Sequence, residues 1–304
     1  MITTLTDTTS SQISSELLNA RRAMGSPAMG MVMTMIIVCT ETEQDSALAS
    51  AVDAGREHPS RILVAVSAQN GHSDRLDAEL RIGEGTQGET VILRMYGRTA
   101  DHSGSVVRPL LLPDSPVVVW WPGTAPADLA NHELGRLATR RVTDAMGAAD
   151  PLQALRLRAD NYQPGDTDLA WTRITQWRSL LAASLDQYPA TVLSASVTAE
   201  ADSASANMLA AWLGASLGVP VTRLSSAGPG ITQATMTTAD GDIVISREDG
   251  KLASYTVPGQ PTRLVALKRP PVSDLVAEEL RRMGADDTFH HAILALKEQQ
   301  AATR

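Results

Sequence analysis

A stretch of 21 residues, residues 158–178, constrains the fold of this chain most strongly. It holds two of the five tryptophans of a sequence in which only 3% of residues are aromatic. Pro164-Gly165 breaks any helix, and Asp166 or Asp168 can then accept the first backbone N–H groups of a new helix. At about 100° per residue, five apolar side chains fall on one stripe: Trp171, Ile174, Trp177, Leu181 and Leu185. The pattern predicts a helix that packs one face into a core.

Arg178 falls on the same apolar stripe. A guanidinium on an apolar face needs a carboxylate or carbonyl partner, because an unpaired buried charge is very costly. The carboxylates nearest in sequence are those of Asp160, Asp166 and Asp168. We therefore expect one of these three to neutralise Arg178.

Nine residues of this stretch form the candidate site. They are Arg158, Asp160, Asp166, Asp168, Trp171, Thr172, Arg173, Trp177 and Arg178. Three roles remain open for them: a salt-bridged structural network, a surface for a partner or ligand, and catalysis. Tryptophan and arginine are enriched at binding hot spots. Trp177 and Arg178 lie on the stripe and are predicted to be scaffold residues, whereas Thr172 and Arg173 lie off it and are better candidates for contact.

Length and composition indicate a globular protein of two modest domains or one large one. The chain has 304 residues, of which 43% are hydrophobic and 20% charged. Its net charge of −8 argues against nucleic-acid binding, which normally requires a basic field. The adjacent Arg140-Arg141 is predicted to lie on a solvated face. The single cysteine, Cys39, excludes an internal disulfide, and its apolar neighbours predict a core position.

An apolar run that follows Arg21-Arg22 and extends to Val38 imitates a signal peptide. It begins, however, after a segment that is predicted to be a capped amphipathic helix. It is also shorter than the roughly 20 residues that span a bilayer. We therefore expect a cytoplasmic protein with no membrane contact.

Apolar patterning in the first half of the chain predicts an α/β fold. A strand at 31–40, a helix at 45–56 and a strand at 61–67 form a β-α-β unit, which favours parallel pairing. Alternating runs at 76–82 and 90–96 predict an antiparallel hairpin. The remaining predicted elements of this half are a helix at 103–111 and strands at 117–121 and 141–144.

The second half shows a similar order. A strand at 191–197, a helix at 203–217 and a strand at 220–224 form another β-α-β unit. Four short alternating runs then predict an antiparallel meander, with Asp-Gly turns joining the middle runs. These runs are 231–237, 242–246, 252–257 and 263–267, and helices at 273–283 and 287–298 follow.

The predicted architecture is therefore two similar α/β halves bridged by central helices. The bridging helices are expected at 151–162 and 168–185. We predict an N-terminal α/β domain at 1–125, a bridging helical segment at 126–188 and a C-terminal α/β domain at 189–304.

Motifs of catalysis and of cofactor binding are weak in this sequence. Gly83 to Gly88 matches the dinucleotide fingerprint G-x-G-x-x-G, but a β-rich run follows it where the fingerprint needs a helix, so we predict a hairpin loop. The six histidines show no zinc-binding spacing. No nucleophile elbow is present. The sequence predicts no cofactor, no metal and no enzyme activity, and it does not indicate a homo-oligomer.

Four segments carry a resemblance to a known family. They are ADNYQPGDTDLAWTRITQWR at 159–178, PVVVWWPG at 116–123, REHPSR at 56–61 and LATRRVTD at 137–144. Together they resemble the OpcA family, the glucose-6-phosphate dehydrogenase assembly proteins. The similarity extends, in order, over nearly the whole chain, and the segment at 159–178 is its specific part.

The resemblance implies a non-catalytic protein of the oxidative pentose phosphate pathway. Such a protein binds glucose-6-phosphate dehydrogenase as an allosteric activator and favours its active oligomer or conformer. Some relatives are linked to redox control through cysteines, a trait that the single Cys39 argues against here. The residues alone leave an alternative open: a sugar-phosphate or nucleotide binding protein, or a degenerate enzyme, with the Asp/Arg cluster at 158–178 as its pocket. A structural module without a ligand is a third possibility.

Overall fold

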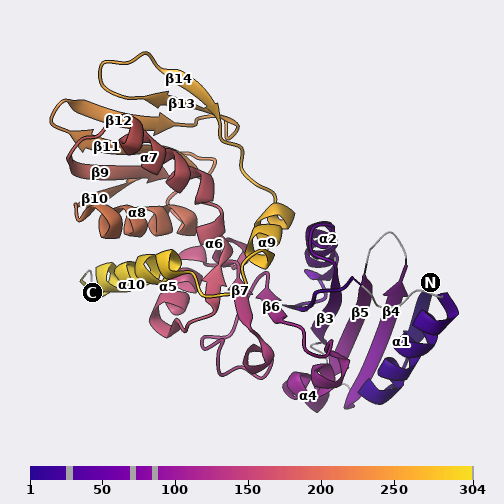
Figure 1. Cartoon of the computed structure of the whole chain (residues 1–304). Coiled ribbons are helices and arrows are strands. Elements are labelled where there is room, and N and C mark those ends of the chain that lie inside the picture. Colours follow the sequence, from indigo (N-terminus) through magenta and orange to yellow (C-terminus); the bar gives the residue numbers. More distant parts are fainter. Residues whose placement is uncertain (25–29, 69–72, 84–87, 303–304) are drawn as a thin grey trace. The chain divides into compact units, whose positions relative to one another are not determined.

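The computed structural model describes residues 1–24, 30–68, 73–83 and 88–302. Within these residues the protein is a mixed α/β fold with one sheet of eight strands and one of six, so the predicted fold class is confirmed. The chain divides into two compact units (Figure 1). Unit 1 consists of Met1–Asp144, Gly165–Thr167 and Val272–Ala285, and unit 2 of Ala145–Pro164, Asp168–Pro271 and Asp286–Arg304.

The predicted domain boundaries, after residues 125 and 188, group the chain differently from these units. Unit 1 continues to Asp144 because the segment after residue 125 adds strand β7 (Arg140–Thr143) to the first sheet, parallel to β6 (Val117–Trp121). Unit 2 contains the helices that were predicted to bridge two domains. The three-domain division stays a prediction, since packing within one structure does not test which segments fold independently.

The sheet of unit 1 has the strand order β1-β4-β5-β3-β2-β6-β7-β8. Its other strands are β1 (Ile2–Leu5), β2 (Met33–Cys39), β3 (Ser60–Ala68), β4 (Arg75–Ile82), β5 (Glu89–Tyr96) and β8 (Asp166–Asp168). Strands β2 and β3 pair in parallel and are joined through α2 (Gln44–Ala54), and β4 pairs antiparallel with β5. The predicted β-α-β unit and hairpin are therefore confirmed.

Helices cover both faces of this sheet. On one face, α1 (Ser10–Met24), α4 (Ser103–Val107) and η1 (Arg108–Leu110) share a core cluster with Trp121. On the other face, α2 packs on β2 and β3, and α9 (Val272–Leu280) packs on α2. Short helices α3 (Arg98–Asp101) and η2 (Gly135–Leu137) complete the unit. Trp120 and Trp121 alternate along β6 and are each 1% exposed, which shows that neither face is open at this strand.

Two predictions on the first half can be compared with the structure directly. Cys39 is buried, as predicted, and burial raises the pKa of its thiol to about 12. The hairpin loop predicted at Gly83 to Gly88 joins β4 to β5, but residues 84–87 lie outside the described part of the chain. Among the described residues, no helix is long and apolar enough to cross a membrane.

The sheet of unit 2 has the strand order β10-β9-β11-β12-β13-β14. Its strands are β9 (Val192–Ala199), β10 (Val221–Ser225), β11 (Ile231–Thr238), β12 (Gly241–Ser246), β13 (Leu252–Thr256) and β14 (Arg263–Ala266). Strands β9 and β10 pair in parallel, and all other pairs are antiparallel. The second β-α-β unit and the meander are therefore confirmed.

The helices of unit 2 share one core cluster with its sheet. They are η3 (Ala145–Gly147), α5 (Pro151–Asn161), α6 (Leu169–Thr172), α7 (Thr175–Gln187), α8 (Ala204–Leu217) and α10 (Asp287–Ala302). Figure 1 shows α8 beside the strands and α10 beside α5. This cluster contains the stripe predicted from the sequence.

One predicted element is wrong: the single helix at 168–185 is in fact two helices, α6 and α7. Its backbone leaves the helical region at Ile174 (φ −97°, ψ 4°), where the N–H bonds to the carbonyl of Trp171 in a tight turn. The stripe itself is confirmed, because its first four members are between 0% and 2% exposed: Trp171, Ile174, Trp177 and Leu181. Burial in one core, rather than one continuous helix, accounts for the pattern.

Gly135 opens η2 at a point where the chain passes close to itself. A Cβ there would overlap the carbonyl oxygen of Leu129. We expect Gly135→Ala to destabilise the protein by about 1–3 kcal/mol, measured as a lower melting temperature. Gly284→Ala is the control, because a Cβ there has nothing within 4 Å. Equal melting temperatures for the two variants would contradict this account of the close approach.

Candidate functional site

Two consecutive arginines on β7 are buried, contrary to the predicted solvated face. Arg140 and Arg141 are 3% and 8% exposed and alternate to opposite sides of the strand. Arg140 donates to Glu279 of α9 from Nε at 2.9 Å and also from Nη2, and its Nη1 donates to the carbonyl of Gly284 at 2.9 Å. The sequence around Arg140 does not reveal that this arginine is buried, because the carboxylate that compensates it lies 139 residues away.

Asp166 of the candidate site lies on β8, directly beside β7. Its carboxylate accepts a hydrogen bond from Nε of Arg141, and both side chains are buried. The backbone N–H of Arg141 donates to the carbonyl of Gly165 at 2.8 Å. Asp166 therefore neutralises a buried arginine of the neighbouring strand, Arg141.

Asp168 caps helix α6. Its side chain is 0% exposed, and Oδ1 accepts from the N–H of Ala170 at 2.8 Å. Oδ2 accepts from the N–H of Ala145 at 3.0 Å. Of the two caps that the sequence left open, Asp168 is the one that opens the helix. Its carboxylate also holds the start of η3 against α6.

Trp171 is the centre of a polar and aromatic cluster in unit 2. The guanidinium of Arg178 lies over its ring, with Cζ 3.5 Å from the centroid, and Nη2 of Arg178 donates to Thr175 at 3.1 Å. The indole Nε1 donates to Asp286 at 3.0 Å. Phe289 packs against the same ring at 5.7 Å between centroids. Arg178 therefore stacks on the aromatic stripe that it was predicted to join, and it remains half-buried.

Trp177 also meets a guanidinium, from a residue that the sequence did not single out. Cζ of Arg247 lies 5.1 Å from the centroid of the Trp177 ring. Arg247 is 4% exposed and donates to the carbonyls of Leu267 and Ile231 at 2.9 and 3.0 Å. Burial lowers the pKa of Arg247 to about 10. Strand alternation could have indicated the burial of Arg247. It stands two residues after Ile245, which is buried, and alternate residues of a strand share a face.

Six of the nine candidate residues are buried. They are Arg158, Asp166, Asp168, Trp171, Thr172 and Trp177. Thr172 was predicted to be a contact residue, but it is 3% exposed. Asp160 is exposed, and its carbonyl accepts from Lys297 at 3.1 Å, whereas Arg173 is half-buried. Only Asp160, Arg173 and Arg178 of the set therefore reach the surface of unit 2.

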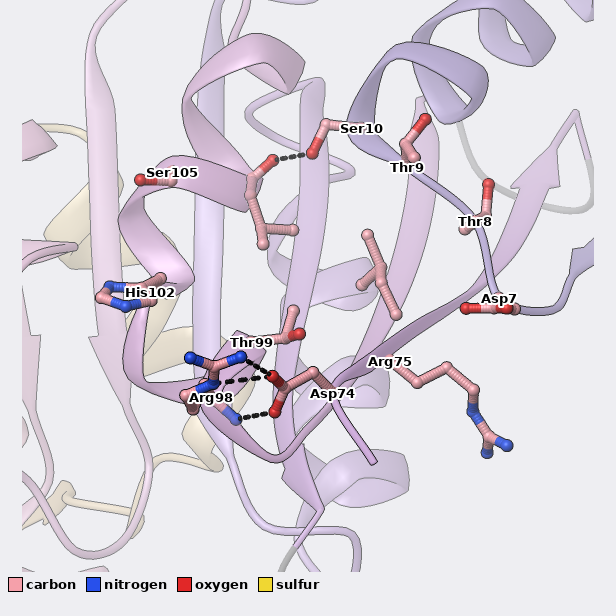
Figure 2. Close-up of a pocket in the computed structure, with 12 residues that line it drawn as sticks. Asp7, Thr8, Thr9, Ser10, Asp74, Arg75, Arg98, Thr99, His102 and Ser105 are labelled. Atoms are coloured by element: carbon pink, nitrogen blue, oxygen red, sulfur yellow. Dashed lines mark hydrogen bonds and ion pairs between the residues drawn. The ribbon is translucent and has the colours of Figure 1, made fainter. Parts of the chain in front are cut away.

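A cavity of about 520 Å³ lies in unit 1, where α1, β4, α3 and α4 meet (Figure 2). Its charges are compensated: Arg98 forms an ion pair with Asp74 at 2.7 Å, and Arg75 forms one with Asp77 at 3.0 Å. Unit 2 has a second cavity of about 430 Å³. The nine candidate residues line neither cavity, so neither is the pocket expected from the Asp/Arg cluster.

Within the described residues, no group of three or more His, Cys, Asp or Glu side chains could hold a metal ion.

Two solved structures illustrate distant likenesses to this chain. A 3-ketoreductase from Actinomadura kijaniata in complex with NADP has a TM-score of 0.46 and 10% identity, covering 88% of this chain and 96% of that one. An oxidoreductase from Sinorhizobium meliloti has a TM-score of 0.42 and 12% identity, covering 90% of each chain. Likenesses at this level do not bear on the activity of the chain.

Comparison with protein families identifies one family over most of the chain. The model of the glucose-6-phosphate dehydrogenase subunit N-terminal domain matches residues 51–160, and that of the corresponding C-terminal domain matches residues 164–293. A protein of Synechococcus elongatus named as an OxPP cycle protein, OpcA, is 33% identical over 102 residues. That alignment spans 32% of this chain and 23% of the relative.

The fold and the cluster define a class of α/β protein with two sheets, in which half of the charged residues at 158–178 are buried. More particularly, the chain belongs to the OpcA family of glucose-6-phosphate dehydrogenase subunits. The resemblance that the sequence carried is thereby confirmed.

The buried pair of Arg140 and Glu279 generates a prediction about stability. Glu279→Ala leaves a guanidinium uncompensated in a site where both side chains are at most 6% exposed. We expect a loss of about 3–5 kcal/mol in the free energy of unfolding, measured by urea denaturation. Glu57→Ala is the control, because its pair with Arg281 is exposed and should leave stability unchanged. Similar losses for both variants would contradict the role of burial.

Asp286 generates a prediction about pH. Burial by itself raises the pKa of Asp286, but hydrogen bonds from Phe289 and Trp171 and the charge of Arg178 outweigh it, so the pKa lies below its ordinary value. A depressed pKa contributes stability above the unfolded value of about 4, and this contribution is lost as the pH falls through the folded pKa.

We therefore expect Asp286→Asn to be less stable than wild type at pH 7, with a difference that shrinks as the pH is lowered towards about 3. Melting temperatures across this range measure the effect. Asp287→Asn, at the exposed neighbouring position, is the control. A difference that is independent of pH would show that the charge of Asp286 does not matter.

Proposed function

We propose that this protein is a non-catalytic subunit that binds glucose-6-phosphate dehydrogenase and favours its active oligomer or conformer. The observation that carries the proposal is the pair of consecutive family matches, to the N-terminal and C-terminal domains of a glucose-6-phosphate dehydrogenase subunit. The name of the Synechococcus relative adds support for a role in the oxidative pentose phosphate pathway. A location in the cytoplasm is part of the same proposal.

The mechanism that we propose is thermodynamic linkage. A protein that binds the active form of an enzyme more tightly than the inactive form shifts the population by the difference in binding free energy. A difference of about 1.4 kcal/mol changes the ratio of the two forms tenfold. Such an activator needs a rigid surface and no catalytic groups of its own.

The candidate cluster supplies both a scaffold and a surface in this proposal. Its six buried members hold the helices in place through ion pairs, a helix cap and aromatic packing. Asp160, Arg173 and Arg178 are the members with exposed area in unit 2. We propose Arg173 as the contact residue, because Arg178 is already stacked on Trp171. Arginine is among the residues enriched at binding hot spots.

An activity titration tests the function. Increasing amounts of this protein are added to purified glucose-6-phosphate dehydrogenase of the same organism, and both the rate and the sedimentation of the enzyme are followed. We expect the rate to rise to a plateau while the two proteins sediment together. An unchanged rate and separate sedimentation would refute the proposal.

A charge reversal tests the contact residue. We expect Arg173→Glu to raise the concentration for half-maximal activation about tenfold, because it places a like or unpaired charge at the interface. Arg263→Glu, at an exposed position on β14, is the control and should activate as wild type does. If Arg173→Glu activates normally, the docking surface lies elsewhere even though the function stands.

A further inference from the structure

The cavity in unit 2 lies among three helices and one edge strand. Its lining comes from Leu152 and Arg156 of α5, Asn207 and Ala210 of α8, Arg223 of β10, and Leu296, Gln299 and Gln300 of α10. A volume of about 430 Å³ is within the range of small-molecule sites in proteins. All of these elements belong to unit 2, so the cavity is complete within it.

Two guanidinium groups line this cavity without a carboxylate partner in the described part of the chain. Arg223 donates to the side-chain oxygen of Asn207 at 3.0 Å and to three backbone carbonyls, those of Val197 at 2.7 Å, Glu200 at 3.3 Å and Leu224 at 3.4 Å. The nearby Glu200 bonds through its carboxylate to the N–H of Gly230 at 2.9 Å. Arg156 is exposed on α5 and forms no ion pair among the described residues. The cavity therefore holds uncompensated positive charge in a chain whose net charge is −8.

The charge of Arg223 is also poorly solvated. Burial lowers its pKa from the ordinary value, and no neighbouring carboxylate acts to raise it. Arg223 is half-buried. A partly desolvated cation with only neutral acceptors gains when an anion approaches, because the anion restores the interaction lost with water. The arginines of the cavity in unit 1 gain less from a bound anion, because they already form ion pairs with aspartates.

Amide side chains supply the rest of the polar lining. Asn207, Gln299 and Gln300 each carry a donor and an acceptor, and Oε1 of Gln300 is buried without a hydrogen-bond partner. Amides of this kind bind hydroxyl groups, which also donate and accept. No aromatic side chain is among the lining residues, so nothing in the lining is suited to stack on a nucleobase.

We propose that this cavity binds a phosphorylated sugar, with Arg156 and Arg223 on the phosphoryl group and the amides on the hydroxyl groups. Guanidinium groups match the geometry and charge of a phosphate monoester, which is close to a dianion at neutral pH. The site would let a metabolite act on this chain directly. It does not depend on the proposed enzyme partner.

Calorimetric titration of the whole chain, without any enzyme, tests the site. The probes are glucose 6-phosphate, inorganic phosphate, adenosine monophosphate and glucose, each up to about 10 mM. We expect glucose 6-phosphate to bind more tightly than phosphate or the nucleotide, and glucose not to bind. The absence of any signal with glucose 6-phosphate would overturn the proposal. Equal or tighter binding of phosphate or the nucleotide would overturn the assignment to a sugar.

Two variants test whether glucose 6-phosphate binds in this cavity. Asn207→Asp keeps the acceptor for Arg223 and adds a negative charge, so we expect it to weaken glucose 6-phosphate binding at least tenfold without lowering the melting temperature. Arg156→Gln removes an exposed cation and should weaken binding about tenfold. Arg263→Gln, outside the cavity, is the control. Wild-type affinity in both cavity variants would overturn the proposed site.

Discussion

The cost of burying a guanidinium governs much of this structure. Arg140 and Arg141 lie inside unit 1, and each is compensated by a carboxylate that comes from a different segment of the chain. A third buried arginine, Arg61, shares Glu89 with Arg21 in the same way. Because removal of either partner strands a charge, each pair fixes the position of a strand or helix relative to the sheet. Unit 2 uses a different solution, in which Arg247 is held by carbonyl groups and the face of Trp177.

Local patterns in the sequence were sufficient to predict most of the elements and both β-α-β units. They succeeded where the signal is carried by neighbours in the chain, as in the apolar alternation of β4 and β5 or the Asp-Gly turn before β12. The helix break at Ile174 was missed, because the apolar spacing continues through it and only the backbone turn reveals it. Strand β8 was also missed, because its three residues are too few to show the alternation of apolar and polar side chains that identifies a strand.

Partners in the candidate site could not be predicted by the same route. The sequence pattern identified candidate residues with charged and aromatic side chains, but their partners were expected among residues close to them in the chain. Trp171 bonds to Asp286, which is 115 residues away. Outside the candidate site, Arg140 bonds to Glu279 at a still greater separation. Burial also changed the role of Thr172, because position relative to one helical stripe does not show what the rest of the unit covers. Long-range pairing is a property of the fold, and a single sequence does not contain it in readable form.

Unit 1 is interrupted in the chain: α9 returns to it after most of unit 2 has been traversed. During synthesis, an N-terminal unit normally folds while the ribosome is still extending the chain. Here the carboxylate that compensates Arg140 lies 139 residues further along the chain, so it is synthesised after most of unit 2. All eight strands of the first sheet are synthesised before α9, so the guanidinium of Arg140 has no carboxylate from Glu279 until that helix arrives.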